Sequence, residues 1–139
     1  MKESAGILVI RDNECLLAHS TGSPWWRSYM PPKGGIEDGE TLAEAASRGT
    51  AEEIGILIQP NELDDNFIVE YSNNRGKIFK RVHIFIYRID NYSDIGLENN
   101  VVPFHQLQEE EINDARFMNA EMIKRKALPR YVEQILEHI

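Results

Sequence analysis

Apolar residues along the chain form short runs that are separated by polar turns. Four of these runs are typical of strands, at residues 5–10, 14–20, 67–71 and 78–89. The segment Arg-Asp-Asn at 11–13 predicts a hairpin between the first two strands. Asn73, Asn74 and Gly76 predict a turn between the last two. Strands that follow one another through such turns favour a sheet.

Helical periodicity is confined to two segments. Residues 42–54 form the clearest helix, since Thr41 and Glu44 make a capping box at its start and Gly55 follows its last turn. The tail of the chain, from about residue 119 to 138, also repeats with a helical period. The sequence therefore predicts one helix in the middle of the chain and a helical end.

The remaining segments are less regular. Pro129 interrupts the helical tail and either begins or kinks its last helix. Residues 21–35 are rich in glycine, proline and serine and predict a loop, while 101–104 and 115–118 indicate short strands. Strands, one helix, further strands and a helical end favour an α/β fold in which helices pack on the faces of a mixed sheet. With no linker or repeat in 139 residues, we expect one domain over residues 1–139.

The chain carries 23 acidic and 15 basic residues, for a formal net charge of −8. Binding to duplex nucleic acid depends on Lys and Arg against phosphates, so we expect no duplex partner. A small anionic substrate is compatible with this charge, because bound divalent cations supply positive charge locally.

A single cysteine, Cys15, excludes an intramolecular disulfide, and its place in an apolar run favours a buried thiol. No apolar run approaches the roughly 20 residues of a membrane span, and the N-terminal run is too short for a secretory signal. We therefore expect a cytoplasmic protein without a membrane partner.

The predicted helix has two distinct sides at 3.6 residues per turn. The side expected to pack holds Leu42, Ala43, Ala46, Thr50 and Ile54. An adjoining stripe holds Ala45, Arg48, Gly49, Glu52 and Glu53. Two adjacent carboxylates beside a core repel each other, and a divalent cation would relieve that repulsion, although a solvated acidic face is the simpler alternative. Gly34, Gly35 and Gly39, just before the helix, favour close backbone approach and an anion at the helix N-terminus.

The same stretch resembles the signature of the Nudix hydrolases, G-x5-E-x7-R-E-U-x-E-E-x-G-U, where U is aliphatic. Seven of its nine specified positions match within residues 34–56, at Gly34, Glu40, Arg48, Glu52, Glu53, Gly55 and Ile56. The motif covers 23 residues, and the order of strands and helices around it is similar to that of the family over the whole chain.

The resemblance implies a Nudix-type α/β/α sandwich that hydrolyses a pyrophosphate bond in a nucleoside diphosphate linked to another moiety. The substrate would be a diadenosine polyphosphate, a nucleotide-sugar or a nucleoside triphosphate. It also implies Mg²⁺, or Mn²⁺, held by Glu52 and Glu53, with a backbone carbonyl at or near Gly34. Arg48 and Glu40 match the ion pair that positions the glutamates. Hard oxygen ligands suit Mg²⁺, which activates water and stabilises the leaving phosphate.

Two positions depart from the signature. Thr50 replaces an aliphatic residue, and Gly49 replaces the glutamate that follows the arginine and that binds metal or acts as a base in the family. Glu111 resembles a late glutamate of the family and is our candidate for the missing ligand or base, with Glu109 and Glu110 as competitors. A catalytically impaired module that binds nucleotide without hydrolysing it is the alternative.

Candidate substrate-binding residues come from two other segments. The string Y-M-P-P-K-G resembles the W-x-P-P-K-G of family members that act on diadenosine polyphosphates, and Lys33 within it could hold a phosphate. Trp26 and Tyr29, with Trp25 beside them, could stack on a base. In the strand 78–89, Lys80 or Arg81 could face the diphosphate, as could His83, on alternate faces. We expect a small-molecule nucleotide as the partner and a monomer or homodimer.

Overall fold

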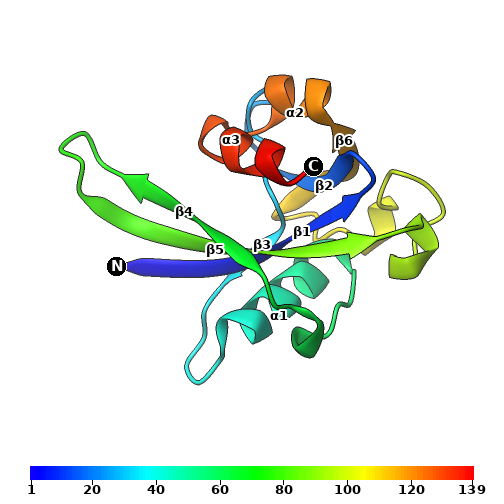
Figure 1. Ribbon diagram of the computed structural model, residues 1–139, viewed down its shortest axis with the longest axis horizontal. Helices are drawn as coiled ribbons and strands as arrows, with labels where there is room; N and C mark the ends of the chain where they lie inside the picture. The colour runs from blue at the N-terminus through cyan, green and yellow to red at the C-terminus, as the bar shows by residue number, and fades with distance from the viewer.

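The computed structural model describes all residues from 1 to 139 (Figure 1). It contains six strands, β1 (Lys2–Arg11), β2 (Glu14–Ser20), β3 (Lys33–Gly35), β4 (Asn66–Ser72), β5 (Ile78–Ile89) and β6 (Ile112–Asn119). Three α-helices accompany them, α1 (Leu42–Ile54), α2 (Ala120–Lys126) and α3 (Pro129–His138). Single 3-10 turns occur at η1 (Pro60–Glu62), η2 (Tyr92–Ile95) and η3 (Phe104–Gln106).

The six strands form one mixed sheet in the order β4-β5-β1-β2-β6, with β3 also paired to β1. Strand β1 is central because it pairs in parallel with β5 along one edge. Its other edge is shared: β3 pairs with its first half, opposite Ala5, and β2 pairs with its end, opposite Ile10. The sheet therefore splits between β2 and β3, and this split faces the C-terminal end of α1.

Helices cover both faces of the sheet, with α1 on one face and α2 and α3 on the other (Figure 1). Side chains of β1 alternate between two apolar cores: Ile7 and Val9 lie on the α1 side, and Leu8 and Ile10 lie on the side of α2 and α3. A strand buried on both faces reads as a continuous apolar run, as β1 does. The predicted α/β/α arrangement is confirmed.

The helix boundaries follow the local capping signals. The Thr41 hydroxyl accepts a hydrogen bond from the Glu44 backbone N–H at 3.1 Å, and the Glu44 carboxylate accepts one from the Thr41 N–H at 2.9 Å. Gly55 ends the helix with a φ of 67°, a left-handed conformation that favours glycine. Pro129 lies in the first turn of α3 and therefore begins the last helix.

Three expectations from the sequence need correction. Residues 101–104 form no strand, because only Val101 makes an isolated bridge and Pro103 has no N–H to extend a ladder. The predicted loop 21–35 contains the short strand β3 at its end. Ala45 and Gly49, which we placed on the stripe adjoining the packing side of the helix, are buried because β3 packs against them.

Two of the simpler expectations agree with the structure. Cys15 is a fully buried free thiol, and burial raises its pKa far above the usual range, so it is unreactive as a nucleophile. None of the helices combines the length and the apolarity needed to cross a membrane.

Candidate active site

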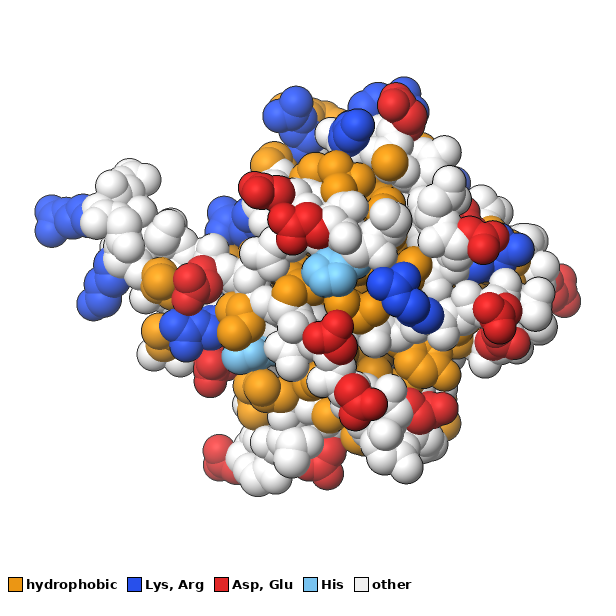
Figure 2. Space-filling model, viewed as in Figure 1, with side chains coloured by type: hydrophobic (Ala, Val, Ile, Leu, Met, Phe, Trp, Pro, Cys, Tyr) orange, Lys and Arg blue, Asp and Glu red, His pale blue; other side chains and the backbone are white.

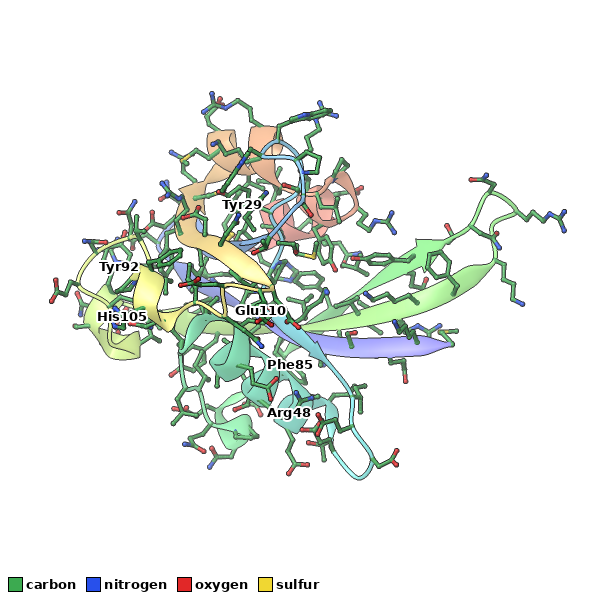
Figure 3. The ribbon with its side chains drawn as sticks, turned by 180° about the vertical axis from the view of Figure 1, so that it is seen from behind. Tyr29, Arg48, Phe85, Tyr92, His105 and Glu110 are labelled. Carbon is green, nitrogen blue, oxygen red and sulfur yellow. The ribbon has the colours of Figure 1, made fainter.

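Arg48 ties α1 to the loop that precedes it. Its guanidinium donates two hydrogen bonds to the Glu40 carboxylate, at 2.7 and 2.9 Å, and one to the Gly35 carbonyl at 2.5 Å. Its remaining nitrogen donates to Glu52 at 3.2 Å. The hydrogen bonds from Arg48 hold the pKa of the Glu40 carboxyl at about 2. The predicted pairing of Arg48 with Glu40 is thus present, and Figure 3 shows Arg48 on α1 below the sheet in that view.

Glu53 is the partly buried member of the glutamate pair at the end of α1, whereas Glu52 is exposed. One oxygen of its carboxylate accepts a hydrogen bond from the backbone N–H of Lys33 at 3.0 Å. Burial raises the pKa of Glu53 to about 7, and the nearby negative charges of Glu111 and Glu52 act in the same direction. The side chain is therefore a poorly solvated carboxylate at the end of α1, with one oxygen left without a hydrogen-bond partner.

The geometry of the β1–β3 ladder explains why the Lys33 N–H is available. In an antiparallel pair, alternate residues direct their N–H and C=O toward the partner strand or away from it. The bonds from Ile7 N–H to Pro32 and from Ile36 N–H to Glu3 fix the phase, so Gly34, opposite Ala5, faces β1. Lys33 and Gly35 face outward, toward Glu53 and Arg48 respectively. We expected a metal-binding carbonyl at or near Gly34. The Gly34 carbonyl faces β1, whereas the carbonyls of Lys33 and Gly35 face away from it.

The acidic loop before β6, residues 108–111, is hydrogen-bonded to the C-terminal end of α1. The N–H of Gln108 donates to the carbonyl of Glu53 at 3.0 Å, which attaches the loop to the end of α1. Thr21, just after β2, donates through its N–H to the Glu111 carbonyl and through its hydroxyl to the Glu109 carbonyl, each at 2.8 Å. Figure 3 shows Glu110 of this loop near the centre of the molecule. The loop therefore lies at the end of α1, and the charge of Glu111 is near enough to act on the pKa of Glu53.

A small cavity opens beside Glu53, at the split between β2 and β3. Its lining is formed by Ala18, Ser20, Met30, Pro31, Lys33, Glu53 and Ile112. Its volume is about 10 Å³, which is enough for about one water molecule or an ion of similar size.

The donor set around this cavity suits a divalent cation. Glu52, Glu53 and Glu111 are close enough for two of them to raise the pKa of the third, so a cation would relieve both burial and repulsion. Glu52 is exposed and bound to Arg48, and no three His, Cys, Asp or Glu side chains are drawn together into a ready-made metal cluster. Holding an ion would thus require Glu52 or Glu111 to swing toward Glu53.

A cluster of basic residues lies next to Lys33 on the α3 side of the sheet. Burial, followed by the charges of Lys33 and Lys2, lowers the pKa of Lys80, and Arg130 adds to the effect. The Lys80 ammonium lies 4.9 Å and the Arg130 guanidinium 3.9 Å from the centre of the Tyr71 ring. These cations form no salt bridge with a carboxylate, so the cluster has unbalanced positive charge. On the face shown in Figure 2, several Asp and Glu side chains lie over α1 and others over α3, and Lys and Arg side chains are seen near α2 and on the β4–β5 hairpin.

Sequence reasoning found part of this cluster only. It named Lys33 and Lys80, the latter from the alternation along its strand. It missed Arg130, Tyr71 and Lys2, because these residues come from three separate elements and meet only in the folded chain. No local pattern in the sequence marks them.

Other predicted substrate-binding residues lie elsewhere. Tyr29 is 3% exposed and donates from its hydroxyl to Asp114 at 2.6 Å, so its ring is a core residue and offers no face to a base. Arg81 faces the opposite side of the sheet from Lys80 and pairs with Glu70 at 3.0 Å. Trp26 is 67% exposed and remains available for stacking.

The neighbouring aromatic and histidine residues are held by contacts within the chain. Trp25 stacks on the buried ring of His19, with ring centroids 4.0 Å apart. His83, on the same face of β5 as Arg81, lies 3.0 Å from the Glu3 carboxylate. Neither contact reaches Glu53.

The raised pKa of Glu53 predicts a specific pH dependence of stability. Its pKa is about 7 in the folded protein against an ordinary 4.5, so its contribution to metal-free stability is complete below pH 4.5 and is lost as pH rises through 7. Glu53→Gln, which cannot ionise, should therefore be more stable than the unsubstituted protein at pH 8, by about 1 to 3 kcal/mol, and nearly equal to it at pH 4.5.

Urea unfolding in the presence of a chelator measures this difference. Glu98 is exposed and makes no hydrogen bond or salt bridge, so Glu98→Gln is a matched control that should leave the stability at pH 8 unchanged. Equal stability of Glu53→Gln and the unsubstituted protein at both pH values would show that the Glu53 carboxyl titrates normally.

Three comparisons with known proteins bear on this site. A family model described as the NUDIX domain matches residues 1–139. No curated protein sequence matches the chain.

Several solved structures share the fold. An Ap4A hydrolase from C. elegans in a binary complex has a TM-score of 0.65 and 24% identity, over 99% of this chain and 93% of that one. A MutT NUDIX hydrolase from Burkholderia pseudomallei has a TM-score of 0.65 and 16% identity, over 99% and 97%.

A larger protein contains the same fold as one part. It is a bifunctional NMN adenylyltransferase/ADP ribose pyrophosphatase from Francisella tularensis, complexed with AMP and a manganese ion. It has a TM-score of 0.69 and 18% identity, over 98% of this chain and 41% of that one. The structural matches establish the shared fold, and the family model covers the full chain. The chain therefore belongs to the Nudix family of pyrophosphohydrolases, as its glycine- and glutamate-rich motif predicted.

Proposed function

We propose that the protein hydrolyses a pyrophosphate link in a nucleotide derivative with the help of Mg²⁺ or Mn²⁺. The observation that carries this proposal is the environment of Glu53. Its carboxylate is half-buried, has a raised pKa, and lies beside a cavity of about 10 Å³ and close to Glu52 and Glu111. Perturbed carboxylates grouped in a recess favour a site of catalysis or metal binding over plain structure.

In this proposal Glu53, Glu52 and Glu111 hold the cation, with an outward-facing backbone carbonyl of β3. The ion, when bound, would supply the chemistry of lowering the pKa of water and neutralising phosphate oxygens. Glu111, or its neighbour Glu110 or Glu109, accepts the proton from water, since their loop is fastened to the end of α1. Arg48 holds the loop containing Glu40 against α1. Glu52 would turn from its hydrogen bond with Arg48 to reach the ion.

The substrate would lie from the cavity toward the basic cluster. Lys33 is near both Glu53 and Lys80, because its charge acts on the pKa of each. Phosphates on the far side of the scissile link would meet Lys80 and Arg130, whose charges no carboxylate balances. Exposed Trp26 is the candidate for stacking on a base. We therefore favour a nucleotide with three or more phosphates, such as a diadenosine polyphosphate, over a nucleotide-sugar.

A second candidate is a module that binds nucleotide without hydrolysing it. Two features favour it. Gly49 stands where the family signature has a glutamate on α1, and Glu52 accepts a hydrogen bond from Arg48. Such a module would be stabilised by nucleotide and would leave it intact.

Activity on a panel of nucleotides separates the two candidates. We expect mononucleotide release that requires Mg²⁺ or Mn²⁺ and stops when a chelator is added. Glu53→Gln should lower kcat by about 100-fold, because metal sites lose 10- to 100-fold even when an outer partner is removed. Glu98→Gln should keep full activity. Nucleotides that raise the melting temperature yet remain unhydrolysed with either metal would support the binding module instead.

The basic cluster predicts a change in KM with substrate length. Lys80→Gln and Arg130→Gln should each raise the KM for a substrate with three or more phosphates by about 10-fold, since a hydrogen bond to a charged group contributes about 1.5 kcal/mol or more. Neither change should alter Mn²⁺ affinity.

Arg81→Gln is the matched control, because Arg81 lies on the same strand and points to the opposite face. Steady-state kinetics on nucleoside diphosphate and polyphosphate compounds measures the effect. Equal KM changes for Arg81→Gln and Lys80→Gln would contradict a phosphate-binding role of the cluster.

A further inference from the structure

Helix α1 and strand β3 touch backbone to backbone at Gly49 and Gly34. A β-carbon placed on Gly49 would lie 2.4 Å from the Gly34 nitrogen and 2.7 Å from both the Gly34 Cα and the Lys33 carbonyl carbon. These distances are far inside ordinary contact, and every atom met belongs to the backbone of β3. Gly49 lies inside a regular helix, where glycine weakens the element relative to alanine. Its presence is therefore explained by the close contact and not by a special backbone angle.

Strand β3 cannot yield to a larger residue at position 49. It is paired to β1 in the middle of the sheet, opposite Ala5, and β1 in turn pairs with β5. The helix would have to retreat instead, by about 1 Å, to restore carbon contacts of about 3.5 Å. Such a retreat carries the whole end of α1 with it.

The group most sensitive to this retreat is Glu53. It lies one turn after Gly49 on the same stripe, and its carboxylate accepts the Lys33 N–H at 3.0 Å. Hydrogen bonds of this kind extend to about 3.2 Å, so a shift of about 1 Å breaks the bond. Arg48 donates a hydrogen bond to the Gly35 carbonyl of the same strand at 2.5 Å. Helix and strand are therefore joined on both sides of Gly34, at Lys33 and at Gly35.

We infer that Gly49 is a positioning residue: by lacking a side chain it lets α1 lie directly on β3 and holds the Glu53 carboxylate against Lys33. At this distance between helix and strand the position has no room for the glutamate usual in the family signature, because its first side-chain carbon would overlap β3. Glycine replaces the signature glutamate because α1 and β3 pack closely at this position. The acidic loop at 109–111 supplies the further carboxylate instead. The contact stands on geometry alone, and its effect on metal binding rests on the proposed function.

Gly49→Ala tests the inference with the smallest added group. We expect the Lys33 amide to lose its protection from hydrogen exchange, measured by NMR, because its acceptor has moved. Affinity for Mn²⁺, measured by electron paramagnetic resonance, should fall by about 10- to 100-fold, in line with loss of support to a metal ligand.

Ala46→Gly is the matched control, since it weakens the same helix on its buried side without adding an atom between α1 and β3. It should leave Lys33 protected and Mn²⁺ affinity unchanged. Gly34→Ala provides a graded case, because a β-carbon there meets the Gly49 Cα at the longer distance of 2.9 Å. Its effects should have the same sign and be smaller, and they carry the test if Gly49→Ala does not fold.

Gly49→Glu separates this inference from the idea of a lost catalytic group. We expect it to behave as Gly49→Ala or worse, with no gain in hydrolysis. A rise in kcat or in Mn²⁺ affinity, or full protection of the Lys33 amide in Gly49→Ala, would overturn the inference. If the unsubstituted protein hydrolyses nothing and binds no Mn²⁺, the proposed function fails, while the exchange of the Lys33 amide still decides the role of Gly49.

Discussion

The hydrogen bond between the Lys33 N–H and the Glu53 carboxylate joins α1 to strand β3 at the proposed site of pyrophosphate hydrolysis. It puts a carboxylate in a partly buried position, where desolvation raises its pKa to about 7. A charge in such a position is costly unless something compensates for it. The Lys33 N–H and the Lys33 charge do so only in part, so the carboxyl takes up a proton near neutral pH, and in the proposed function a metal ion would take the place of that proton. Most features around Glu53 can be understood as ways of keeping this carboxylate in place.

Several independent contacts meet at this junction. Arg48 connects α1 to the loop before it and to β3, and the backbone of Gln108 connects the acidic loop to the Glu53 carbonyl. The split of the sheet, where β2 and β3 share one edge of β1, leaves the outward edge of β3 free to receive the carboxylate. The position of one side chain therefore depends on β3, on α1 and on the acidic loop, which is distant from both in sequence.

The features of this arrangement that depend on residues close together in the chain could be predicted from the sequence. The caps of α1 at Thr41 and Gly55, the pairing of Arg48 with Glu40 and the α/β/α layers all follow from short-range patterns or from the resemblance, and the structure has them. Strand β3 could not be foreseen, because three residues within a glycine- and proline-rich segment show no strand pattern and are ordered only by pairing with β1. The burial of Tyr29, the cluster of Arg130 with Tyr71 and the contact of Gly49 with Gly34 likewise depend on segments brought together by the fold. A single-domain extent, a cytoplasmic location and a monomeric or dimeric state stay predictions.

A crystal of the protein soaked in Mn²⁺ together with a non-hydrolysable nucleotide polyphosphate offers the most direct measurement. Anomalous scattering at the manganese edge locates the ion without reference to any assumed ligand. We predict a peak within about 2.0 to 2.6 Å of a Glu53 oxygen, the range for hard cations on carboxylates, with Glu52 or Glu111 turned toward the same ion. A bound nucleotide with no peak at Glu53, and with Glu53 still resting only on the Lys33 N–H, would contradict the proposed metal site.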